Sequence, residues 1–176
     1  MPMPIETTHI RIRSEEKDDY SQIDEVLLQA FERKEEATLV HQLRKNGGYI
    51  ALVALEGDKV VGHVFFSPTP IQTENGLTDA LSLAPVAVRP QNQRQGVGAL
   101  LIEKGLKRCK KDGHRVIIIL GHPEYYPRFG FVTASSKGIK PPFTVPDEAF
   151  MIIELQEGAL KGAEGVVSYP PEFEGV

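Results

Sequence analysis

The sequence predicts an α/β fold with a mixed sheet, and the order of its expected elements carries this prediction. Alternating apolar residues over 9–13 indicate a first strand. In the residues that follow it, the apolar positions have the spacing of helices. Residues 49–55 and 59–67 are predicted as two strands joined by a turn at Glu56-Gly57-Asp58. Over 80–120 the order becomes strand, helix, strand, which predicts a right-handed crossover between parallel strands.

Two helices are expected between the first strand and the hairpin. Either Asp18 or Asp19 suits the cap of the first helix, whose apolar positions are Ile23, Val26, Leu27, Ala30 and Phe31. The second helix is expected over 34–44, and Asn46-Gly47-Gly48 ends it. Its buried side is expected to hold Ala37, Val40 and Leu43.

The chain is expected to form one domain over 1–176, with a core over 9–155 and a C-terminal extension over 156–176. The elements after the hairpin complete the core. Residues 115–120 are apolar and mostly β-branched, as in a strand buried on both faces. The other expected elements are a loop over 68–79, a strand over 80–89, the central helix over 96–111, a short helix or turn over 123–129, closing strands over 131–134 and 149–155, and a surface tail from Gly158.

Composition excludes several classes of protein. The net charge of -4 does not suggest a general nucleic-acid partner. No apolar run approaches the roughly 20 residues of a membrane span, and residues 1–6 lack the pattern of a signal peptide. The single cysteine, Cys109, suits a reducing cytoplasm. The five histidines have no paired spacing, so no metal is expected.

The charge is unevenly distributed. Residues 89–115 hold eight Lys and Arg against two acids, whereas 141–176 hold one lysine against seven acids. A solvated helix face explains such a basic patch equally well, but this patch coincides with a glycine-bearing turn. The turn joins an apolar strand to a helix, contains Gly96 and Gly98, and has no carboxylate from position 80 to 98. Free backbone N–H groups and the helix dipole make such a turn an anion site.

Two familiar phosphate loops do not fit this turn. A Walker loop requires Lys and Ser or Thr after its last glycine, where Ala99 and Leu100 stand. A dinucleotide fingerprint requires a third glycine, where Leu101 stands. The remaining pattern is Gln93-x-x-Gly96-x-Gly98, although a tight turn alone could also use both glycines.

This pattern resembles the acyl-CoA signature of the GCN5-related N-acetyltransferases (GNAT). The order of strands and helices over 9–155 matches that family, as does Tyr126-Pro127-Arg128-Phe129-Gly130-Phe131, which resembles its closing motif. Three segments look like a bacterial subgroup of predicted acetyltransferases without an assigned substrate: 62–68, 120–126 and 149–151. The resemblance implies a mostly antiparallel mixed sheet whose central parallel crossover splays to admit acyl-CoA.

The resemblance also implies a site and a mechanism. Acetyl-CoA would be the co-substrate, with its pantetheine arm along Val86, Ala87 and Val88. Its pyrophosphate would lie at the loop and helix start formed by Gln93, Arg94, Gln95, Gly96, Val97, Gly98 and Ala99. An amine would attack the thioester directly, and Tyr126 would protonate the departing thiolate, because a phenol is protonated at neutral pH.

The general base is left open by the sequence. The strand before the loop has no acid, so His122, Glu124, a water or an acid of the first helices could serve. The segment before Tyr126 is shorter than in many members, so Tyr125 could take its role, and a buried aromatic without chemistry is the alternative for Tyr126. His63 alternates within a strand and is expected to be structural.

Two further alternatives concern the whole protein. A module that binds CoA or a metabolite without catalysis would keep the same fold.

Pro85 lies in the strand expected over 80–89, where it cannot donate a backbone hydrogen bond. It suggests either that this strand begins only at Val86 or that the hydrogen-bond ladder between strands is broken there to admit an extended ligand. The acceptor is an unidentified amine, and acidic residues 1–60 would tolerate a cationic one. Dimers are common in such proteins, although no segment marks an interface.

Overall fold

The protein folds into two compact units, each built from separated stretches of chain. The computed structural model describes residues 9–176, so the predicted lack of a leader over residues 1–6 lies outside the described residues. The first unit comprises the described chain up to Phe66, Ala84–Gly105 and Glu172–Val176, and the second comprises Ser67–Leu83 and Leu106–Pro171. The single domain expected over 1–176 stays a prediction.

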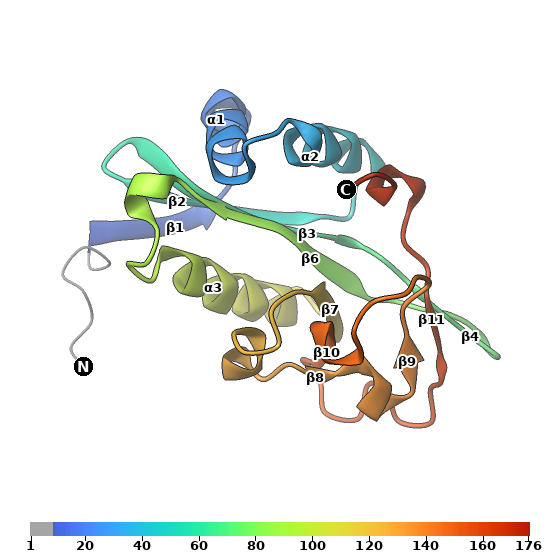
Figure 1. Cartoon of the computed structure of the whole chain (residues 1–176). Helices are drawn as coiled ribbons and strands as arrows, with labels where there is room; N and C mark the ends of the chain where they lie inside the picture. Colours follow the sequence, from blue (N-terminus) through green and yellow to red (C-terminus); the bar gives the residue numbers. More distant parts are fainter. Residues whose placement is uncertain (1–8) are drawn as a thin grey trace. The chain divides into compact units, whose positions relative to one another are not determined.

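The first unit is a sheet with helices on both faces (Figure 1). Its strands lie in the order β1 (Ile10–Ser14), β2 (Ile50–Glu56), β3 (Lys59–Pro68) and β6 (Leu81–Val88). One face is covered by α1 (Tyr20–Phe31) and α2 (Glu35–Asn46), and the other by the first part of α3 (Val97–Lys111). Cover on both faces explains why β2 and β3 are apolar almost throughout.

The core of this unit joins α1 and α2 to the sheet. The helical spacing expected in α1 is confirmed, because Ile23, Val26 and Leu27 are fully buried. α2 buries Ala37, Val40 and Leu43, as expected, together with Leu39. These side chains pack against Val53, Leu55, Phe65 and Ala87 of the strands.

The second unit contains the start of β6 and the closing strands. Here β6 begins beside β7 (Val116–Leu120), and the two are parallel, with Leu81 opposite Ile117 and Ser82 opposite Ile118. The predicted parallel crossover is therefore confirmed. β10 (Phe150–Glu154) pairs antiparallel with β7 and with β8 (Val132–Thr133), as the predicted closing strands require.

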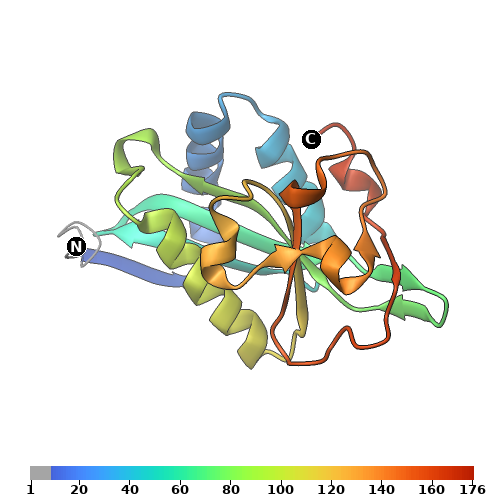
Figure 2. The same cartoon turned by 60° about the horizontal axis from the view of Figure 1, so that its bottom comes forward.

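A small sheet in the second unit corrects two sequence predictions. Its strands lie in the order β5 (Gly76–Thr78), β4 (Ile71–Thr73), β11 (Gly165–Val167) and β9 (Ile139–Lys140). The segment expected to be a loop thus forms the β4–β5 hairpin, and the expected surface tail supplies β11 beside it (Figure 2). Strands of three residues carry too little periodicity to be recognised before their partners are known.

Two local predictions are also wrong. Asp19 stands at the N-cap position of α1 but its side chain does not cap that helix. Its carboxylate accepts from Arg13 and from the Glu16 N–H, and the second bond belongs to a capping box that begins the 3-10 turn Lys17–Asp19. The strand expected over 80–89 is confirmed as β6, and of the two alternatives for Pro85 only the later start at Val86 is wrong, because β6 runs through Pro85 from Leu81. Both pairs that join β6 to β7 precede Pro85, so the missing N–H of the proline falls outside that ladder.

Two glycines let α3 lie close to β3. A Cβ on Gly62 would lie 2.9 Å from Cδ1 of Leu101 and 3.3 Å from Cγ1 of Val97. A Cβ on Gly105 would lie 2.5 Å from Cε1 of Phe66, whose side chain is fully buried. The first unit therefore has no room for a methyl group between this helix and its sheet.

Replacing Gly105 with Ala is expected to destabilise the protein by about 1–3 kcal/mol, because the new methyl group overlaps the Phe66 ring. This loss outweighs the gain of about 0.5–1 kcal/mol that alanine brings to a helix interior. Urea unfolding measures the difference. In a Phe66→Leu background the same substitution should cost much less, and an equal cost in both backgrounds would contradict the proposed contact.

Candidate functional site

The loop between β6 and α3 presents backbone N–H groups at a helix start. Gly96 lies just before α3, and its carbonyl accepts the N–H of Leu100 at 3.0 Å, which starts the helical ladder. The first helical N–H groups, from Val97 onward, have no partner within the helix. Gly96 has φ of +87°, a conformation that an L side chain rarely adopts.

The loop is folded back on the end of β6. The side-chain amide of Gln93 donates to the carbonyl of Val88 at 2.9 Å, and that of Gln95 donates to the carbonyl of Gln91 at 3.3 Å. Arg94 is exposed and has φ of +63°, so the loop turns sharply at this residue. The amide side chains thus bond within the loop, and its backbone turns around the start of α3.

Exposure differs among the predicted loop and strand residues. Gln93, Arg94 and Gly96 are exposed, whereas Gln95, Gly98 and Ala99 are half-buried and Val97 is buried. On β6 the pattern alternates, because Val86 and Val88 are half-buried whereas Ala87 is only 4% exposed and belongs to the core. All ten of these residues lie in the first unit.

Arg89 anchors the start of the loop. Its side chain is almost fully buried, and its Nε donates to the carbonyl of Val60 at 2.7 Å. Its Nη1 lies 3.5 Å from Oε1 of Gln29, and its Nη2 lies 3.5 Å from Oε2 of Glu25, both on α1. Its backbone N–H donates to the carbonyl of Val61. This arginine therefore ties the loop both to β3 and to α1.

Tyr126 belongs to the second unit and begins the 3-10 helix Tyr126–Phe129. Its ring is 8% exposed and packs edge-on against Tyr125 and Phe131. A Cβ on Gly121 would lie 2.4 Å from this ring, so the glycine makes room for it. Burial, together with neighbouring Tyr125, raises the pKa of Tyr126 to about 12, so its hydroxyl stays protonated at neutral pH.

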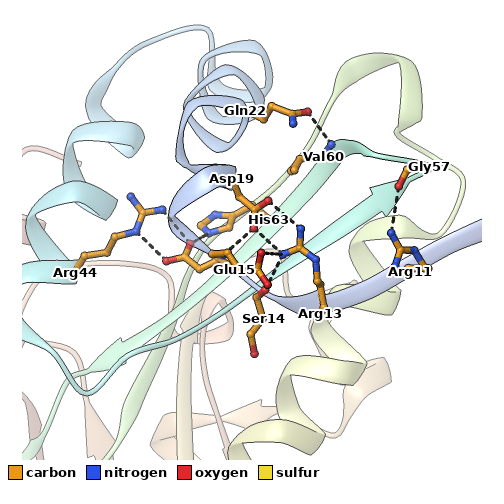
Figure 3. Close-up of polar contacts among 11 residues, drawn as sticks. Arg11, Arg13, Ser14, Glu15, Asp19, Gln22, Arg44, Gly57, Val60 and His63 are labelled. Atoms are coloured by element: carbon orange, nitrogen blue, oxygen red, sulfur yellow. Dashed lines mark hydrogen bonds and ion pairs between the residues drawn. The ribbon is translucent and has the colours of Figure 1, made fainter.

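A buried polar cluster lies beneath α1 and α2 in the first unit (Figure 3). It consists of Glu15, Arg44 and His63, which we call the Glu15 cluster. Nε and Nη2 of Arg44 each donate to the Glu15 carboxylate at 2.9 Å. Nε2 of His63 lies 2.9 Å from Oε1 of the same carboxylate. The Arg44 guanidinium stacks over the Tyr20 ring, with Cζ 3.7 Å from the ring centre.

Two nitrogens of the Glu15 cluster have no partner among residues 9–176. They are Nδ1 of His63 and Nη1 of Arg44, and both are buried. Burial lowers the pKa of His63 despite its bond to Glu15, so its imidazole is neutral at pH 7. Burial alone would raise the pKa of Glu15, but the bonds from His63 and Arg44 outweigh it and lower that pKa.

Sequence reasoning missed this cluster. A histidine inside the apolar run of β3 was a signal, because a buried imidazole requires a polar partner. The partners, however, come from the end of β1 and from α2. Among the other candidate bases, His122 and Glu124 are exposed, and Glu36 is buried in an ion pair with Arg33.

Within residues 9–176, no group of three or more His, Cys, Asp or Glu residues is placed to hold a metal ion. No helix in this part of the chain combines the length and the apolar character that crossing a membrane requires. Cys109 is free and fully buried, and burial raises the pKa of its thiol to about 12. A thiol in this environment is unreactive and serves as a core side chain.

Comparisons with known proteins agree on one family. The family model described as "Acetyltransferase (GNAT) domain" matches residues 11–134. The Escherichia coli K12 protein named "Uncharacterized N-acetyltransferase YhbS" is 35% identical over 164 residues, which are 92% of this chain and 97% of that protein. A second E. coli protein, "Uncharacterized N-acetyltransferase YjhQ", is 35% identical over 144 residues, 80% of each chain.

Solved structures extend the comparison to the fold. The crystal structure of E. coli YhbS in complex with CoA has a TM-score of 0.86 at 33% identity, covering 94% of this chain and 92% of that one. A GNAT family acetyltransferase from Brucella melitensis in complex with acetyl-CoA has a TM-score of 0.76 at 29% identity, covering 94% and 99%. The mixed α/β fold of the present chain is therefore that of these proteins.

The buried imidazole predicts a pH dependence of stability. Because the pKa of His63 is lower in the folded state than the ordinary 6.5, the unfolded chain binds a proton first, and stability falls as pH drops below about 6.5. His63→Gln should remove up to about 1.4 kcal/mol per pH unit from that slope. Urea unfolding between pH 7 and pH 5 measures it. The control, His122→Gln, changes an exposed histidine and should keep the slope; identical slopes for all three proteins would refute the prediction.

Proposed function

Because the chain belongs to the GNAT acetyltransferase family, we propose that it transfers the acetyl group of acetyl-CoA to a primary amine by direct attack. The observation that carries this proposal is the loop before α3, where a positive φ at Gly96 turns the chain into a helix start. The structures of YhbS with CoA and of the Brucella protein with acetyl-CoA support the same donor for this chain.

The loop residues would hold the donor in two parts. Backbone N–H groups over 94–99 would bind the pyrophosphate, since a helix start favours negative charge. The pantetheine arm would lie along Val86, Ala87 and Val88, where Val86 and Val88 are half-buried and can be reached. A backbone N–H of this strand would polarise the thioester carbonyl. Gln93 would hold the loop to the strand through its bond to Val88.

The chemical step requires a proton for the leaving thiolate. The neutral amine attacks the thioester carbonyl carbon, a C–N bond forms and the C–S bond breaks. Tyr126 would donate the proton, because its raised pKa keeps the phenol protonated at neutral pH. Tyr125, which packs edge-on against Tyr126, is the alternative donor. We expect the reaction to take place in the cytoplasm, where the free Cys109 stays reduced.

Thiol release from acetyl-CoA tests the whole proposal. The acceptors are spermidine, kanamycin, and a peptide with a lysine and a free N-terminus, since the acidic residues of the N-terminal part would tolerate a cationic amine. Release above the rate without amine supports transfer. CoA binding without release to any of these amines would support a sensor module instead.

Acetyl-CoA at 100 times its Kd should stabilise the wild-type protein by about 2.7 kcal/mol, seen as a rise in Tm. Gly96→Ala should lose most of this rise, because its φ of +87° disfavours a side chain and the loop must change shape. Gly113→Ala is the matched control, since it has φ of +92° at the far end of α3 with open space around its Cβ. An unmoved wild-type Tm would refute donor binding.

Tyr126→Phe should lower kcat at least about 10-fold, because it removes the proton donor, while the Kd for CoA stays within about twofold. Tyr125→Phe serves as the comparison, and isothermal calorimetry and thiol release measure both quantities. If Tyr125→Phe loses turnover and Tyr126→Phe does not, the two tyrosines exchange roles. Full turnover in both variants would contradict a tyrosine donor.

A further inference from the structure

We propose that His63 accepts the proton of the acceptor amine through a bridging water, and that Glu15 positions it. This inference rests on the proposed function and adds the base that transfer requires. An amine is protonated at neutral pH and has no lone pair until a base removes that proton. The feature that carries the inference is Nδ1 of His63, a buried nitrogen with no partner among residues 9–176.

The hydrogen bond to Glu15 decides which nitrogen of His63 is free. An ionised carboxylate can only accept a hydrogen bond, so Nε2 of the neutral imidazole must carry the proton that it donates to Oε1. Nδ1 is therefore left with a lone pair. Two bonds from Arg44 fix the carboxylate at the same time. A base oriented by a carboxylate through its other nitrogen is the arrangement that general-base catalysis uses.

His63 lies beside the strand on which the thioester is expected. β3 and β6 are neighbours in the sheet, and a Cβ on Gly62 would lie 3.2 Å from the carbonyl oxygen of Ala87. Phe65 and Ala87 belong to the core beneath α1 and α2. Because side chains alternate along a strand, His63 points to the same face as Phe65. The imidazole thus lies one strand from the proposed arm of the donor.

The charges around His63 partly offset the burial that disfavours its protonated form. Glu15 and Asp19 favour the imidazolium, whereas Arg44 opposes it. Asp19 is itself paired with Arg13. The Tyr20 ring stacks against Arg44, and burial raises the pKa of Tyr49, so its phenol is uncharged at neutral pH. Burial keeps the imidazole neutral, so it can accept a proton at pH 7.

The protons balance over one turnover. The ammonium loses its first proton through the water to Nδ1 of His63, and the imidazolium is held by the Glu15 carboxylate. The free amine forms the C–N bond, the C–S bond breaks, and the thiolate takes a proton from Tyr126. The second N–H proton of the amine restores the Tyr126 hydroxyl, and His63 then releases its proton to solvent.

The first experiment is the pH profile of kcat/KM with acetyl-CoA and whichever of the three amines gives most thiol release. His63→Gln keeps an amide donor for Glu15 but cannot accept the proton. We expect a fall of about 100-fold or more and the loss of the acidic limb below about pH 6.5, with the Kd for CoA within about twofold. Glu15→Gln should move the acidic limb to lower pH, since His63 loses its counter-charge.

The control is His114→Gln, which lies outside both the loop and the Glu15 cluster and should keep the wild-type profile. If His63→Gln turns over within twofold of wild type with the same acidic limb, His63 is structural and the inference is overturned while the proposed function stands. If the wild-type protein releases no thiol with any amine, the proposed function fails and the inference fails with it.

A second measurement needs neither a variant nor an acceptor. Nitrogen-15 NMR of histidine-labelled wild-type protein reports the tautomer of His63. We expect the neutral form with the proton on Nε2 at pH 7, because Glu15 accepts the Nε2 hydrogen bond. A proton on Nδ1, or a charged imidazole at pH 7, would overturn the inference even if His63→Gln does not fold.

Discussion

The buried carboxylate of Glu15 is the interaction on which the first unit depends. It follows β1, and it binds Arg44 of α2 and His63 of β3, so one anion joins three elements. A buried charge is tolerated only when it is paired, and removing one partner of such a pair typically costs roughly 3–5 kcal/mol. The same constraint that holds α2 to the sheet also fixes the orientation of the imidazole, so stability and the proposed proton transfer share one set of bonds.

The loop before α3 depends on a different constraint, the supply of backbone N–H groups. Gly96 bends the chain so that a helix starts at Val97, and Arg89 holds the preceding turn to β3 and α1. Arg89 itself is buried and faces the protein, which leaves the free N–H groups of the helix start to bind an anion. Donor recognition by this site would therefore rest on main-chain geometry, with side chains shaping the loop.

Elements with a local signal were predicted well from the sequence. The crossover from β6 through α3 to β7 follows from an apolar strand, a glycine turn and a helical period, all within one stretch of chain. The β4–β5 hairpin and β11 were missed, because their partners are distant in sequence and each strand has only three residues. Asp19 has the right residue type for a cap, yet Arg13 and the Glu16 N–H compete for its carboxylate.

The sequence by itself determined the family-like loop, from Gln93 to Ala99, because a glycine turn at a helix start is encoded by adjacent residues. It also supplied Tyr126 as a candidate donor. Only the tertiary structure decided the state of His63, since its partner Glu15 lies 48 residues away and Arg44 lies 29 residues from Glu15. Burial, pairing and an unpartnered nitrogen are properties of neighbours in space, so no local pattern in the sequence could show them.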